Sequence, residues 1–299
     1  MRISNSILAA MAATFVLASC SNDENGGVEI AEYITVNTSI GSLTRTATAD
    51  DGTQSFAKDD QISVYAWTGS ADVVNADGMV VNNSVNTYDG TKWSASPQML
   101  WKDMSSVHFF LGVYPSKEIT DFTADAYTLD VTKQEQSDLL VAVNTGTDNA
   151  GFTATNTAVP LQFDHVMAKL IVNLSFRNQW ATTPKVESVT TGNLKSKATV
   201  NYLTKSATVT AEDATNIELP VATANTTYQS IMVPQAGNDA TIAIKIGEKD
   251  YTYTGTVKLE SGKYTTVNLI VGRDGITLGS VSINDWGEGT TINGGEAQE

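Results

Sequence analysis

Residues 166–176 read VMAKLIVNLSF, and this stretch decides the fold class. Apolar side chains stand at every second position, from Val166 through Leu170 and Leu174 to Phe176. A period of two places them on one face of an extended chain, whereas a helix would need a period of 3.6. The stretch therefore predicts a β-strand with one face in a core.

The same periodicity extends outward over most of the chain. One hairpin signal is clear, because TIAIKI at 241–246 is followed by Gly247-Glu248-Lys249-Asp250 and then by YTYTGTV. Turn residues recur about every 8–12 residues, a spacing typical of β-sandwiches. A helix is expected only in short pieces, for example around 133–141. The other predicted strands are 33–40, 61–67, 107–114, 186–190, 197–203, 206–210, 228–233, 250–257, 263–271 and 276–283.

The length of 299 residues predicts about two domains. Residues 144–158 are rich in Thr, Asn and Gly and lack apolar periodicity, so they read as a long loop or linker. We expect the boundary near 155–164, with an N-terminal β-sandwich at 33–160 and a C-terminal one at 161–299.

The formal net charge of −15 repels phosphate backbones, and we expect no nucleic-acid partner. Two interpretations of this charge stay open. It keeps the protein soluble through self-repulsion, or it serves the binding of calcium or of a cationic partner.

The N-terminus has the pattern of an export signal. Residues 1–19 form the predicted signal peptide, with Arg2 before an apolar stretch of 12 residues from Ile7 to Ala18. Leu17-Ala-Ser-Cys20 resembles a bacterial lipobox, which predicts fatty acylation of Cys20 (palmitate and related chains) and anchoring in the outer membrane. Residues 20–32 would be the lipidated, flexible tether. Cys20 is the only cysteine, so no disulfide can form within the chain.

The sequence offers little catalytic chemistry. His108 lies in an apolar strand pattern, and His165 follows Asp164, where an acid–base couple is conceivable without a nucleophile to serve. No zinc-ligand spacing exists, and the aspartates at 121, 125 and 130 do not fit an EF-hand. We predict no enzymatic activity, no metal and no cofactor. Five tryptophans either pack in the sandwiches or form a sugar-stacking platform: Trp67, Trp93, Trp101, Trp180 and Trp286.

Several segments together resemble the fimbrillin-like lipoproteins, the subunits of type V pili. The resemblance extends in order over about 250 residues. It is carried by the lipobox ending at Cys20, LTRT at 43–46, FAKDDQISVYA at 56–66, Tyr114-Pro115, FDHVMAKLIV at 163–172, LESGKY at 259–264 and INDW at 283–286.

The resemblance implies an all-β protein with two transthyretin-like β-sandwiches in tandem after the signal peptide. It also implies assembly by strand exchange with other pilus subunits, in which a protease cuts after an Arg and the first strand leaves. On this sequence the cut would fall between Arg45 and Thr46. The released strand would carry Ile34, Val36, Thr38 and Ile40 on one face.

These implications predict a surface-exposed outer-membrane lipoprotein that becomes part of a fimbrium and adheres to a host or bacterial surface ligand. The thirteen residues after Trp286, GEGTTINGGEAQE, are Gly-rich and acidic and make a poor β-donor. Tip, accessory and anchor roles therefore stay open beside the stalk role. Two other hypotheses also stay open, namely a surface glycan-binding lipoprotein that keeps its lipid and a secreted hydrolase.

Overall fold

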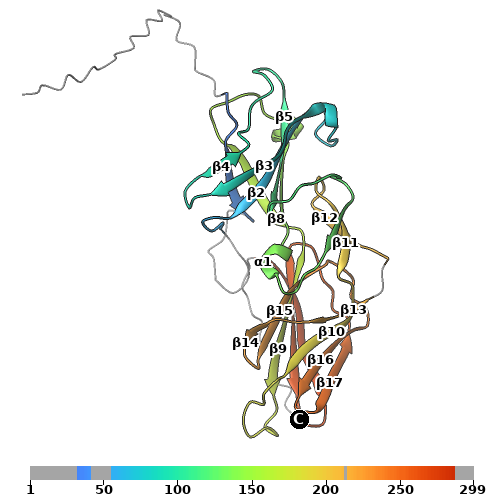
Figure 1. Ribbon diagram of the computed structural model, residues 1–299. Coiled ribbons are helices and arrows are strands. Elements are labelled where there is room, and N and C mark those ends of the chain that lie inside the picture. The colour runs from blue at the N-terminus through green and yellow to red at the C-terminus, as the bar shows by residue number, and fades with distance from the viewer. Residues whose placement is uncertain (1–31, 42–54, 212–213, 287–299) are drawn as a thin grey trace, which may run out of the picture.

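The computed structural model describes residues 32–41, 55–211 and 214–286. The signal peptide, Cys20, Arg45 and Thr46 lie outside these residues. The all-β prediction is confirmed, since the regular elements of the described ranges are nineteen strands, a single four-residue α-helix and two short 3-10 turns. Figure 1 shows an elongated molecule with one sheet at the N-terminal end and two sheets stacked at the other. Among the described residues, no helix is long and apolar enough to cross a membrane.

The N-terminal half is built on a seven-stranded sheet with the order β1-β8-β7-β5-β2-β3-β4. Neighbouring strands are antiparallel except β1 and β8, which are parallel, with Val36 opposite Val159 and Ile40 opposite Phe163. Its strands are β1 (Val36–Ile40), β2 (Gln61–Thr68), β3 (Met79–Tyr88), β4 (Trp93–Ser96), β5 (His108–Tyr114), β7 (Leu140–Asn144) and β8 (Val159–His165). The 3-10 turns are η1 (Ala76–Gly78) and η2 (Thr147–Asn149).

The C-terminal half is a sandwich of a five-stranded and a four-stranded sheet. The stretch VMAKLIVNLSF supplies β9, the central strand of the five-stranded sheet, which is parallel to β18 and antiparallel to β15. The predicted hairpin is β16–β17, with a two-residue turn at 247–248. The five-stranded sheet has the order β14 (Val221–Thr223), β15 (Thr227–Met232), β9 (Ala168–Phe176), β18 (Lys263–Val271), β19 (Ile276–Asp285). The four-stranded sheet has the order β13 (Thr215–Glu218), β10 (Ser188–Leu194), β16 (Ala240–Ile246), β17 (Lys249–Gly255).

A small third sheet joins the two halves. Strand β6 (Asp125–Thr128) comes from the N-terminal half, and it pairs with β11 (Lys197–Asn201), which pairs in turn with β12 (Ser206–Val209). The predicted boundary at 160/161 lies within β8, and two residues separate β8 from β9. The division into two domains stays a prediction.

The buried apolar residues form two clusters. One cluster lies on one face of the seven-stranded sheet and contains Ile34 and Val36 from the β1 region. The other begins on the opposite face, with Tyr65 and Trp67, and continues without interruption into the C-terminal sandwich around Val172. Because burial of apolar area is the main favourable term in folding, this shared core fixes the two halves to each other.

The short helix expected around 133–141 is present as α1 (Gln134–Ser137), and it ends before Leu140, which begins β7. Strand β3 was not foreseen because its interior face is polar. Its Ser84 donates a hydrogen bond to the Pro97 carbonyl at 2.6 Å, and Asn86, also buried, donates to the Ser84 carbonyl at 3.0 Å.

Candidate functional site

Strand β1 lies at the seam, which is the line along which the two ends of the seven-stranded sheet come together. It pairs with β8 on one side, where Val159 N–H donates to the Thr35 carbonyl at 2.8 Å. On the other side, the Trp93 indole N–H of β4 donates to the Thr38 hydroxyl at 2.9 Å. The sheet therefore curls until its first and last strands meet, and β1 lies where they meet.

The chain just before β1 makes a second set of backbone contacts across this seam. Ile34 N–H donates to the Met99 carbonyl at 2.9 Å, and Trp101 N–H donates to the Glu32 carbonyl at 3.3 Å. These bonds connect the β1 region to the segment that follows β4. The β1 region thus has backbone partners on both sides, unlike an ordinary edge strand.

The side chains of the β1 region follow the predicted alternation. Ile34 and Val36 are buried, at 1% and 8% exposure, and Thr38 and Ile40 on the same face are half-buried. Thr35 and Asn37 between them are exposed. One face of the strand therefore belongs to the core, while release of the strand stays a prediction.

Strands β8 and β5 form an apolar surface beside β1, here called the apolar bed. Val159, Leu161 and Phe163 of β8 are all buried. Gly112 of β5 makes room for two of them, because a Cβ at Gly112 would lie 2.6 Å from Phe163 Cζ and 3.1 Å from Leu161 Cδ1. These β8 side chains belong to the same core cluster as Ile34 and Val36.

Aromatic rings gather near the C-terminal end of β1. Phe56 packs edge-on against Trp93, Tyr114 and Phe163, with ring centroids 5.1, 5.5 and 5.2 Å away. Neither Phe56 nor the bond from Trp93 to Thr38 was identified from sequence. Trp93 belongs to the β4 region and Thr38 to β1, so their meeting depends on sheet closure, for which the sequence carries no local signal.

The first histidine is structural. His108 is fully buried in β5, and its Nε2 accepts a hydrogen bond from Lys102 N–H at 3.1 Å. Burial, which disfavours the charged imidazolium, lowers its pKa from the ordinary value. Its Nδ1 has no hydrogen-bond partner among the described residues.

The second histidine joins the N-terminal half to the end of the C-terminal half. His165 Nδ1 is bonded to Asp138 Oδ1 at 2.8 Å, and the imidazole stacks on the Trp286 ring with centroids 3.9 Å apart. The couple with Asp164 conceived from sequence is not formed, because Asp164 pairs with Lys205 instead.

The remaining candidates also have structural roles. Asp121 accepts hydrogen bonds from the backbone and the hydroxyl of Thr123, and Asp130 accepts them from the hydroxyl and the backbone of Thr132, which lowers the pKa of each aspartate. Asp125 contacts Lys117 and Tyr202. In the part of the chain that the structure describes, no group of three His, Cys, Asp or Glu could hold a metal ion. All five tryptophans are buried or half-buried, so none presents an exposed platform.

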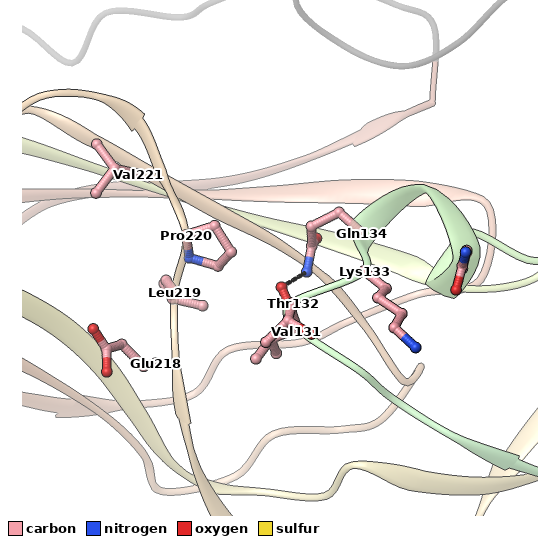
Figure 2. A pocket seen from close by; sticks show the side chains of 9 residues that line it. Val131, Thr132, Lys133, Gln134, Glu218, Leu219, Pro220 and Val221 are labelled. Atoms are coloured by element: carbon pink, nitrogen blue, oxygen red, sulfur yellow. Dashed lines mark hydrogen bonds between the residues drawn. The ribbon is translucent and has the colours of Figure 1, made fainter.

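A shallow hollow of about 720 Å³ lies between the α1 segment and residues 218–221. Figure 2 shows Gln134 at its rim, donating to the Val131 carbonyl at 2.9 Å. The same amide fixes β15, since its Oε1 accepts from Ile231 N–H at 2.7 Å. The charged residues at this hollow are Lys133, which pairs with Asp130, and Glu218. This lining offers packing rather than catalysis.

Comparison with known proteins identifies the fold and family of the chain. The sequence profile described as fimbrillin-like matches residues 44–286, which is most of the chain. The chain belongs to the fimbrillin-like family. A search of curated proteins found no match.

Solved structures share the fold of this fimbrillin-like chain at low sequence identity. A proposed cell adhesion protein from Bacteroides ovatus has a TM-score of 0.67 and 18% identity, covering 85% of this chain and 97% of its own. Another from Bacteroides uniformis has a TM-score of 0.66 and 19% identity, with coverage of 86% and 100%. A fimbrial protein from Bacteroides vulgatus has a TM-score of 0.54 and 15% identity, with coverage of 84% and 99%.

Proposed function

We propose that this fimbrillin-like chain is a structural subunit of a cell-surface fimbria that serves adhesion and assembles by exchange of β1. Family membership supports the fimbrial role. The observation that carries the exchange is the place of β1 in the seam, with an apolar face in the core, a backbone partner in β8 and, just before β1, backbone bonds from Glu32 and Ile34 to the segment after β4. A strand from another subunit could make the same kinds of contact, as in β-strand addition.

Energetics require that the strand be cut free before it is exchanged. Complete burial of a side chain such as Ile34 or Val36 contributes about 1.5–3 kcal/mol, and each backbone hydrogen bond adds about 0.5–1.5 kcal/mol net. While β1 is covalently attached, its effective concentration at the groove is very high, and a donor in solution competes poorly. Cleavage removes this advantage.

The order of segments fits cleavage between Arg45 and Thr46. β1 ends at Ile40, and Phe56 already packs against the body of the N-terminal half. A cut after residue 45 would separate β1 from everything that follows, and Phe56 would stay in place. Cys20 lies on the released side, so the predicted export lipoprotein would lose its outer-membrane lipid together with β1.

The test is mass spectrometry of the protein purified from the cell surface, with wild type compared with Arg45→Ala. We expect wild-type fimbriae to contain a chain that begins at Thr46 without lipid. The Arg45→Ala chain should keep an acylated Cys20 and stay out of fibres. An assembled wild-type chain that begins at acylated Cys20 would overturn the cleavage step and favour an anchor subunit.

A further inference from the structure

We propose that Trp93 sets the register of the strand that replaces β1, and that this strand comes from a chain of different sequence rather than from residues 287–299 of a second copy. The inference rests on the exchange proposed above and names the kind of partner that the groove accepts. That partner presents a hydrogen-bond acceptor to Trp93 and aliphatic side chains two and four residues before it.

Trp93 contacts two aromatic rings where the seam closes. Its ring contacts Phe56 edge-on at 5.1 Å and Tyr88 at 5.0 Å, both measured between ring centroids. The indole N–H is a donor with no acceptor capacity, and here it bonds to the Thr38 hydroxyl. A replacement strand that offers no acceptor at this point would leave a partly buried donor without a partner, which is unfavourable.

Alternation of apolar side chains cannot fix the register by itself. A slip of one residue would turn the apolar face outward and is excluded, but a slip of two residues preserves the alternation. In β1 the neighbours two residues from Thr38 are Val36 and Ile40. Either slip would bring an aliphatic side chain to the Trp93 N–H. The Trp93 N–H therefore disfavours the two-residue slips in either direction, although the apolar bed would accommodate both.

Residues 287–299, running in the direction of β1, do not fit this groove. Within 287–299, GEGTTINGGEAQE, the only large aliphatic residue is Ile292. With Ile292 in the Val36 place, Gly294 would meet Trp93 and offer no side-chain acceptor. With Ile292 in the Ile34 place, Gly294 would fill the Val36 pocket. With Ile292 in the Ile40 place, Glu288 would have to enter the Val36 pocket.

The test uses the full-length chain with a site-specific protease sequence inserted within 42–54, so that opening does not depend on Arg45. After cleavage, synthetic peptides compete for the groove, and native mass spectrometry measures their relative occupancy. The peptides are residues 33–40 (YITVNTSI), the same peptide with Thr38→Val, a control with Thr35→Val at an exposed position, and residues 287–299.

We expect the 33–40 peptide and the Thr35→Val control to bind alike, and Thr38→Val to bind about 5–20-fold more weakly, as the loss of one partly buried hydrogen bond implies. In a Trp93→Phe protein, which keeps a ring but lacks the N–H, the difference between the first peptide and Thr38→Val should disappear. The tail peptide should not compete.

Each other outcome has a defined meaning. Equal binding of the Thr38→Val peptide to the wild-type groove would overturn the role of Trp93 while leaving strand exchange intact. Tail binding as tight as that of 33–40 would overturn the requirement for a different chain. If no peptide enters the cleaved protein, the exchange in the proposed function is refuted, and the inference falls with it.

Discussion

The substitution Ile34→Ala tests whether the β1 region opens independently of the rest of the molecule. Ile34 is 1% exposed and lies in the N-terminal core cluster. Truncation of a buried Ile to Ala costs about 2–5 kcal/mol, and we take the lower part of that range, about 2–3 kcal/mol. Local opening should become more frequent by about 30–150-fold, since each 1.4 kcal/mol is a factor of ten.

Native-state hydrogen exchange measures this opening directly. The reporter is the Val159 amide, which donates to the Thr35 carbonyl, and its exchange should accelerate by that factor in Ile34→Ala. The Leu219 amide in the C-terminal half, which donates to the Val189 carbonyl, should keep its rate.

The matched control is Ile244→Ala, a buried Ile in β16, which should accelerate Leu219 rather than Val159. Equal acceleration of both amides in Ile34→Ala would mean that β1 leaves only when the whole protein unfolds. That result would refute a separable β1.

Three further predictions concern stability. His108 has a lowered pKa in the fold, so the unfolded chain binds more protons than the folded chain once the pH falls through the unfolded pKa of about 6.5. The free energy of unfolding should therefore decline from pH 7 to 5. His108→Gln, which keeps an acceptor for Lys102 N–H, should show a smaller decline in urea titrations. An unchanged slope would show that burial of His108 is not its source. Gly112→Ala should lower the free energy of unfolding by about 1–3 kcal/mol, because its Cβ would press on the Phe163 ring; an unchanged urea midpoint would contradict the tight packing of β5 on β8. Hydrogen bonds from two lysines lower the pKa of Glu260 to about 2, so its stabilising contribution is present above about pH 4.3 and lost as the pH falls toward 2. Glu260→Gln should flatten the acid-unfolding curve in that window, and identical curves would count against the contribution.

The sequence was informative for β9 and for the hairpin β16–β17, which have one apolar and one polar face, whereas β8, which also alternates, was assigned to the boundary region. β9 and the hairpin β16–β17 could be predicted because their alternation is uninterrupted and the turn carries a glycine at positive φ. β3 could not, since its buried Ser84 and Asn86 are satisfied by hydrogen bonds that only the folded chain provides.

The candidate site was predictable only in part. The face of β1 follows from alternation, which is a local property of the chain. The meeting of Trp93 with Thr38, and of His165 with Asp138, depends on the path of the chain between them. Residues separated by 55 and 27 positions carry no joint signal in a single sequence.

The pairing of β6 with β11 has a mechanical consequence. A filament that holds a cell to a surface is pulled along its length, and a subunit stretches first at its thinnest connection. Here only Val166 and Met167 link β8 to β9, but four residue pairs between β6 and β11 bridge the same gap. Tension is thereby shared among several hydrogen bonds and a continuous apolar core. Under force the subunit should therefore behave as a single stiff segment rather than as two halves that separate at a flexible linker.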